Sequence, residues 1–159
     1  MKIKGQPVFQ FNPFAIKDQP NSFIKTEYER ILSFMTNGDT PYEIAFDIDC
    51  YANMGYLLGE MIARYYVDTS NYEAQLKVDS SNQLVAERNQ WMREHKDEKI
   101  PAISYFDSKV TSMLMDRYKT LNEMEGNLKR FKFAYDSLQD KQNALKKSLD
   151  AVKFDVLNR

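Results

Sequence analysis

Apolar residues recur at alternating spacings of three and four along two long segments of the chain. In the first segment, the recurring positions are Ile44, Ile48, Tyr51, Gly55, Leu58, Ile62, Tyr65, Thr69, Tyr72 and Leu76. In the second segment, they are Ile103, Val110, Leu114, Leu121, Met124, Leu128, Phe131, Tyr135, Leu138, Leu145, Leu149, Val152 and Val156. A 3-4 spacing is the period of a coiled-coil seam. The pattern predicts two long helices, over residues 41–95 and 103–157.

Local signals place the ends of these helices. Thr40 precedes Pro41, which suits the first helical position, and Glu43 completes a capping box with Thr40. The first seam fades after Leu76, so a break near 68–71 or a stutter near 79 is possible within this helix. A proline disfavours helical geometry in the residue before it, so we expect a turn over 96–102.

The first forty residues have a different pattern. Residues 1–20 hold three prolines and a short apolar alternation, which predicts an extended N-terminal arm that carries Phe9, Phe11 and Phe14. A short helix over about 22–37 should follow, capped by Asn21 or Ser22 and ended by Gly38.

These elements define an all-α fold. We expect a helical domain over 21–159 built on a long antiparallel, coiled-coil-like hairpin, with each long helix roughly 80 Å in length at about 1.5 Å per residue. Such a hairpin cannot bury all its apolar surface alone, so we expect subunits to associate through the helices. Polar seam residues such as Arg117 and Gln142 would then set the register.

Composition narrows the function classes. The formal net charge is −1, which predicts no strong global attraction to a polyanion. Residues 129–147 nevertheless hold six basic and two acidic residues, a local charge of +4. A single cysteine excludes an intrachain disulfide, and the most apolar window, 44–67, contains four charges. We therefore expect a cytoplasmic protein without a membrane span, in the host cytoplasm if a phage encodes it.

Catalytic chemistry finds little support in the residues. His95, the only histidine, lies in the charged turn region, and we interpret it as solvated. Cys50 lies in an apolar helical pattern, as expected of a small buried side chain. Glu43 and Asp47 share a helix face, which we interpret as solvated. We predict neither an enzyme nor a metal or cofactor site.

The stretch NLKRFKFAYDSL, residues 127–138, combines two patterns. Leu128, Phe131, Tyr135 and Leu138 fall on the seam, whereas Phe133 points away from it beside cations. An outward aromatic residue among basic side chains can stack on a base while the cations meet phosphates. The alternative is that Phe133 packs on another helix of an oligomer.

From about residue 42 to 156 the chain resembles the UvsY family of phage recombination mediators. The resemblance rests on EIAFDIDCYANMGYLLGEMI, on the charged LVAERNQWMREHKDEK, and on a C-terminal helix with Ala144-Leu145-Lys146-Lys147-Ser148. It implies a homo-oligomer that binds single-stranded DNA and loads a RecA-like recombinase against a single-strand-binding protein. The family's basic element before the turn matches Leu84–Arg88 only in part, since Val85 stands where a lysine is expected.

The leading hypothesis is therefore a single-stranded DNA-binding recombination mediator. The residues expected to contact DNA are Arg88, Trp91, Arg93, Lys96, Lys129, Arg130, Lys132 and Phe133. The main alternative is a phage virion or assembly protein, a scaffolding, adaptor or cargo protein that acts through coiled-coil and arm contacts. A regulator of a single host protein is a third interpretation.

Overall fold

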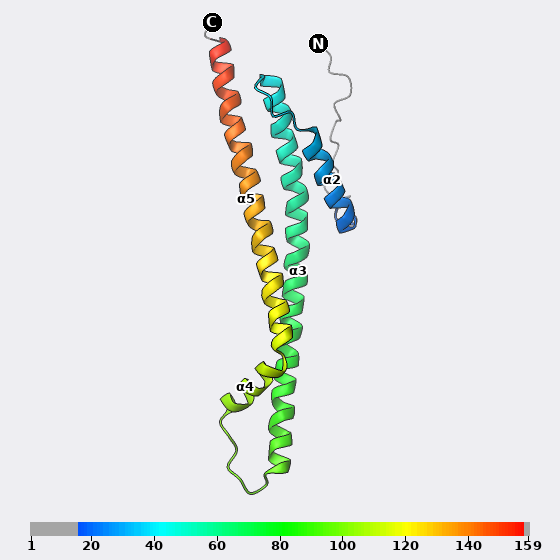
Figure 1. Cartoon of the computed structure of the whole chain (residues 1–159), viewed down its shortest axis with the longest axis vertical. Helices are drawn as coiled ribbons and strands as arrows, with labels where there is room; N and C mark the ends of the chain where they lie inside the picture. Colours follow the sequence, from blue (N-terminus) through cyan, green and yellow to red (C-terminus); the bar gives the residue numbers. More distant parts are fainter. Residues whose placement is uncertain (1–15, 158–159) are drawn as a thin grey trace. The chain divides into compact units, whose positions relative to one another are not determined.

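The computed structural model describes the backbone of residues 16–157 and the side chains of residues 16–154. These residues form four helices (Figure 1): α2 (Asn21–Phe34), α3 (Pro41–Glu94), α4 (Ile103–Met113) and α5 (Met115–Leu157). No strand occurs over 16–157, so the described part of the chain is all-α, as predicted. Most of the predicted arm, including Phe9, Phe11 and Phe14, lies outside the described residues, as does the side chain of the predicted seam residue Val156.

The chain divides into two compact units. Unit 1 comprises Met1–Arg64 with Arg130–Arg159, and unit 2 comprises Tyr65–Lys129. Helices α3 and α5 contribute to both units. Figure 1 shows α2 beside the first part of α3 in unit 1.

Unit 1 has a core made by three helices. Its buried residues come from the chain just before α2 and from α2, α3 and α5: Ile16, Ile24, Ile31, Cys50, Met54, Leu57, Leu58 and Leu138. Tyr135 of α5 lies against Gly55 and Gly59 of α3, where a Cβ on either glycine would make ordinary van der Waals contact with α5 side chains. Within unit 1, α3 and α5 are antiparallel, since Gln142 reaches Ile48 while Tyr135 lies at Gly59.

Unit 2 is held by a smaller core and two ion pairs. Phe106 and Val110 of α4 are buried in unit 2, as are Leu76 of α3 and Leu121 and Leu128 of α5. Asp79 pairs with Arg117, and Glu87 pairs with Lys109. Glu87 follows Asp79 along α3, whereas its partner Lys109 precedes Arg117. The α4–α5 segment is therefore antiparallel to α3 in this unit too.

The capping box at the start of α3 is confirmed. The Thr40 hydroxyl accepts the Glu43 N–H at 3.3 Å, and the Glu43 carboxylate accepts the Thr40 N–H at 3.2 Å. The Thr40 hydroxyl also donates to the Glu43 carboxylate at 2.6 Å, and this hydrogen bond, followed by the one from the Thr40 N–H, lowers the pKa of the Glu43 carboxyl. From this start, α3 runs without a break to Glu94. Within it, the Thr69 hydroxyl donates to the Tyr65 carbonyl at 2.7 Å and so is satisfied inside the helix.

The helix over 22–37 differs from its prediction at both ends. Its N-cap is Pro20, and neither Asn21 nor Ser22 caps it through a side chain. It ends at Phe34 rather than at Gly38, because the amides of Thr36 and Asn37 hydrogen-bond to a side chain of α3 instead of continuing the helix.

The single helix predicted over 103–157 is wrong, because Leu114 separates α4 from α5. Leu114 has φ −99° and ψ 11°, outside helical geometry. The buried residues of α4 are Phe106 and Val110, whereas the predicted seam residue Ile103 is 60% exposed. Val110 is therefore buried as the predicted seam requires, but Phe106 is buried in place of Ile103.

The polar seam residues Arg117 and Gln142 have partners inside the chain. Arg117 Nη1 donates to Asp79 Oδ2 at 2.5 Å, and Gln142 Nε2 donates to the Ile48 carbonyl at 3.3 Å. The hydrogen bond with Arg117 lowers the pKa of the Asp79 carboxyl. These contacts align α3 with α5 within one subunit.

Candidate nucleic-acid interface

The stretch 127–138 presents two different sides on α5. Leu128 and Leu138 are buried. Phe131 and Tyr135 are half-buried and pack against the core of unit 1. Phe133 is 75% exposed. The prediction that the seam residues pack inward while Phe133 points outward is confirmed.

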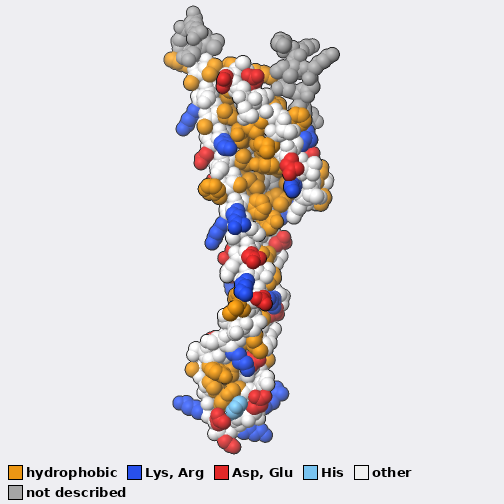
Figure 2. Space-filling model, viewed as in Figure 1, with side chains coloured by type: hydrophobic (Ala, Val, Ile, Leu, Met, Phe, Trp, Pro, Cys, Tyr) orange, Lys and Arg blue, Asp and Glu red, His pale blue; other side chains and the backbone are white. Residues whose placement is uncertain are grey.

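Cations surround Phe133 along the helix. Lys129 and Arg130 precede it by four and three residues, which places them on the same helix face, and both are exposed. Lys132 is exposed as well and lines a shallow groove of about 300 Å³ with Gly59, Ile62, Tyr135 and Asp136. In Figure 2, unit 1 shows an apolar area bordered by both basic and acidic side chains.

An acidic residue borders the same face. Asp136 follows Phe133 by three residues and is exposed. The positive side of this face therefore lies toward the N-terminal end of α5, at Lys129 and Arg130.

The predicted residues at the end of α3 form a second group, in unit 2. Arg88, Arg93 and Lys96 are exposed, and Lys96 lies in the turn after α3. Trp91 is half-buried, and its ring stacks on the His95 ring with centroids 4.7 Å apart and planes within 9°. One face of the indole is therefore covered by the imidazole.

The interpretation of His95 as a solvated residue is wrong. Its ring is half-buried, and Nδ1 lies 3.1 Å from the Trp91 carbonyl oxygen. A carbonyl can only accept, so Nδ1 carries the hydrogen in this contact. The Trp91 carbonyl also accepts the His95 backbone N–H at 3.0 Å, so His95 contacts this carbonyl through both its backbone and its ring at the C-terminal end of α3.

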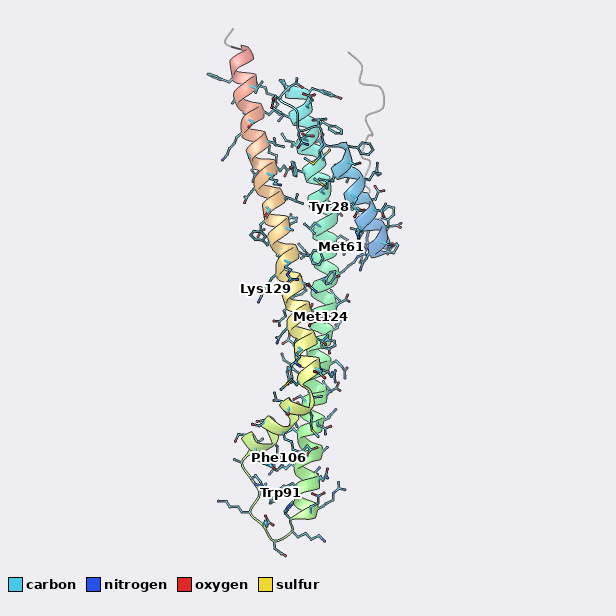
Figure 3. All side chains as sticks on the ribbon, viewed as in Figure 1. Tyr28, Met61, Trp91, Phe106, Met124 and Lys129 are labelled. Atoms are coloured by element: carbon cyan, nitrogen blue, oxygen red, sulfur yellow. The ribbon has the colours of Figure 1, made fainter. Side chains whose placement is uncertain are left out.

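Within unit 2, Lys129 lies far from the group at the end of α3. The ion pair between Asp79 and Arg117 places these two residues at the same height along α3 and α5. Arg88 lies nine residues after Asp79 on α3. Lys129 lies twelve residues after Arg117 on α5, which runs in the opposite direction. At about 1.5 Å per residue the two cations are roughly 30 Å apart. Figure 3 shows Trp91 and Lys129 well separated in unit 2.

The partly matching element at Leu84–Arg88 is also used structurally. Glu87 is buried and pairs with Lys109 of α4, and that hydrogen bond lowers the pKa of the Glu87 carboxyl. Glu87 therefore joins α3 to α4, while Val85 is exposed.

Asp47 has a role that the sequence pattern did not indicate. It is 2% exposed, and its two carboxylate oxygens accept the Thr36 and Asn37 N–H groups, each at 2.8 Å. Asn37 has a positive φ of 49°, which asparagine tolerates better than most residues. The interpretation of the Glu43 and Asp47 face as solvated is thus wrong for Asp47, which closes the turn between α2 and α3.

Arg64 is the second residue that the sequence analysis missed. Its Nη2 donates to the Ile16 and Lys17 carbonyls at 2.8 and 3.0 Å, and its Nη1 donates to the Gln19 carbonyl at 2.6 Å. Nη1 also donates to Asn21 Oδ1 at 2.9 Å, and Nε to Glu60 at 2.9 Å. One guanidinium of α3 therefore holds the segment that leads into α2.

Cys50 is fully buried in the core of unit 1, as predicted. Burial, followed by the nearby charges of Asp47 and Asp49, raises the pKa of the thiol to about 11. The thiolate, which is the reactive form, is therefore scarce at neutral pH.

We expect Cys50 to resist a thiol-specific reagent at pH 8 in the folded protein and to react at once in denaturant. Because its folded pKa is raised, the thiol contributes stability that is complete below its unfolded pKa, about 8.5, and that is lost as pH rises toward 11. Urea unfolding of wild type and Cys50→Ala at pH 8 and pH 10.5 measures this loss. An equal loss in both proteins would contradict the assignment to Cys50.

Among the side chains described, no group of three or more His, Cys, Asp or Glu residues could hold a metal ion. Within the described helices, no segment is long and apolar enough to cross a membrane. Neither protein-family models nor characterised proteins nor solved structures match this chain.

Proposed function

We propose that this chain binds single-stranded DNA through the outward face of α5 and assists the loading of a RecA-like recombinase in competition with a single-strand-binding protein. The observation that carries the DNA-binding part is Phe133, a phenylalanine 75% exposed on a helix whose preceding turn presents Lys129 and Arg130. Single exposed apolar side chains are common on protein surfaces, so the basic residues of the preceding turn are what distinguish Phe133.

The chemistry of this face fits an unpaired strand. A single-stranded base offers an open π-face that can stack on the Phe133 ring, whereas a base in a duplex does not. Phosphates of the same strand would meet Lys129, Arg130 and Lys132, with release of counterions. Stacking and phosphate contacts carry no base readout, so binding is expected to be tolerant of sequence.

The role in recombination rests on the resemblance of residues 42–156 to the UvsY family. That resemblance also implies a homo-oligomer and a long helical hairpin. The antiparallel pairing of α3 with α5 inside each unit supports the hairpin. Contacts of Arg88, Trp91, Arg93 and Lys96 with DNA stay a prediction, separate from the α5 face.

The alternative function, a virion or assembly protein, is favoured by a different observation. Exposed apolar side chains are spread over every helix, among them Leu32 of α2, Val85 of α3, Tyr105 of α4 and Phe154 of α5. Protein contacts would cover such residues. Deletion of residues 1–20 separates the two functions, because an assembly protein that docks through its arm should lose its partner while a DNA binder keeps its affinity.

We expect the double variant Phe133→Ala/Arg130→Ala to weaken binding of a labelled single-stranded oligonucleotide by roughly 10- to 100-fold. Loss of one stacked base costs about 1–3 kcal/mol, and each 1.4 kcal/mol is tenfold in affinity. Fluorescence anisotropy at two salt concentrations measures the effect. The salt dependence of the variant should also be shallower, by about 0.7 in slope for one lost phosphate contact.

Phe154→Ala is the matched control, since Phe154 is a similarly exposed phenylalanine on the same helix. It should bind as wild type does. Asp136→Asn should strengthen binding, because it removes a negative charge beside the site. An equal loss of affinity in Phe154→Ala and in Phe133→Ala/Arg130→Ala would overturn the proposed mechanism. Wild-type binding that is insensitive to salt would overturn it as well.

A further inference from the structure

Helix α3 carries a second apolar stripe within unit 2, on the side away from its core. Val67, Val78, Val85 and Met92 are 54%, 52%, 58% and 37% exposed. With Asn71, Ala74, Ser81 and Arg88, which are also exposed, they follow the spacing 4-3-4-3-4-3-4. We call these eight residues the outer stripe.

The outer stripe is distinct from the seam that packs inside the chain. The buried residues of α3 in unit 2 are Thr69, Leu76 and Glu87, none of which belongs to the outer stripe. A helix that buries one heptad face and exposes another one rich in β-branched residues has a surface shaped for a second helix. The outer stripe covers 26 residues, about 39 Å of helix.

The polar members of the outer stripe decide which helix fits. In parallel pairing with a second copy, each position meets itself, so two Arg88 guanidinium groups would face each other in the seam. In an antiparallel pairing with its two-fold axis between residues 79 and 80, each residue instead faces the one for which the two residue numbers add to 159. Arg88 then faces Asn71 of the second copy, and the Asp68 carboxylate lies one turn from that Asn71.

The same register matches the sizes of the side chains. Val78 faces Ser81, Ala74 faces Val85, and Val67 faces Met92, so each large residue meets a smaller or flexible one. Shifting the register by a heptad places Arg88 opposite Val78. Among the described side chains, no hydrogen bond or ion pair within the chain engages the Asn71 amide or the Arg88 guanidinium, so both are available to a second copy.

We propose that two copies of this chain associate through the outer stripe of α3 as an antiparallel pair, with the two-fold axis between Asp79 and Ser80. An isologous contact of this kind is self-complementary and closes at two copies. The inference deepens the proposed self-association of the mediator and rests on it, but it requires no DNA. It assigns Arg88 to the contact between copies.

The contact is expected to be weak. A single helix face of this length belongs among the smaller specific interfaces, about 1,200 Å² or less in total. Sedimentation velocity of the full chain without DNA, over a concentration series, should therefore show a reversible rise in mass.

Four variants test the register. Val78→Lys should abolish the rise in mass, whereas the matched control Ile103→Lys, at a 60% exposed residue of the same unit, should not. Asn71→Lys should also be monomeric, because two lysines would face two Arg88 side chains. Arg88→Glu should be weakened, because each glutamate would lie near Asp68 of the other copy.

The double variant Asn71→Lys/Arg88→Glu should recover association, since each lysine then faces a glutamate. A parallel pair would stay apart in that variant, because like charges would meet at both positions. A monomeric wild type, or a double variant no better than Asn71→Lys, would overturn the proposal. Circular dichroism melting of each variant checks that the monomer is folded. Loss of DNA binding in Phe133→Ala/Arg130→Ala with unchanged association would separate this contact from the DNA face.

Discussion

Replacing Asp47 with alanine is expected to destabilise unit 1 by about 2–3 kcal/mol. The carboxylate accepts two backbone N–H groups, of Thr36 and Asn37, each at 2.8 Å, and it is 2% exposed. Removing the carboxylate takes away two hydrogen bonds to a charged group, each of which contributes about 1.5–3 kcal/mol, and water at the exposed Thr36 and Asn37 offsets part of the loss. Urea unfolding measured by circular dichroism gives the size of the effect.

Asp49→Ala is the matched control for this experiment. Asp49 is the same residue type on the same helix two positions later, but it is exposed. We expect a change within about 0.5 kcal/mol for Asp49→Ala, as for most surface substitutions. The loss in the free energy of unfolding for Asp47→Asn should lie between those of Asp47→Ala and Asp49→Ala, because the asparagine amide keeps one acceptor oxygen. Similar losses for Asp47→Ala and Asp49→Ala would contradict the role given to Asp47.

The second large effect is expected at Arg64. Its guanidinium donates to three backbone carbonyls and one side chain of the segment 16–21, and it pairs with Glu60. Hydrogen bonds that involve a charged group contribute about 1.5–3 kcal/mol. Arg64→Ala should therefore release residues 16–21 and loosen α2 from α3, with a loss of about 2 kcal/mol.

Hydrogen exchange of the α2 amides reports this local opening. We expect the protection of Ile24 and Ile31 to fall in Arg64→Ala while amides of unit 2 keep theirs. Arg64→Lys should also lose most of the protection of these α2 amides, because a lysine ammonium cannot reproduce the several donors of the planar guanidinium. Unchanged protection of α2 in Arg64→Ala would show that the apolar contacts of Ile24 and Ile31 hold α2 without it.

Asp47 and Arg64 act on the same element, and neither lies on α5. Together they attach α2 to α3 at its two ends, through the turn 35–38 and through the segment 16–21. The DNA face of α5 uses neither residue. Variants at Asp47 or Arg64 are therefore expected to bind single-stranded DNA as wild type does, at temperatures where unit 1 is folded.

What the sequence determines here is local. The 3-4 spacing places the seam of α3, the Thr40–Glu43 box starts that helix, and the offset of Phe133 from the seam sends it outward. Each of these features depends on residues within one or two helical turns. Helix geometry and capping act over that distance, so the sequence suffices for them.

Only the tertiary structure decides what joins distant residues. Asp47 binds amides ten and eleven positions earlier, and Arg64 binds carbonyls more than forty positions earlier. Leu114 interrupts the helix although the 3-4 pattern runs through it, and Phe106 rather than Ile103 is buried in unit 2. The distance between Arg88 and Lys129 follows from the antiparallel pairing of Asp79 with Arg117. The sequence spacing of Glu43 and Asp47 is the same whether Asp47 is buried or solvated. The charges of Arg88 and Lys129 are likewise the same whether these residues lie close together or roughly 30 Å apart. Burial and distance are properties of the packed chain, which periodicity along the sequence does not contain.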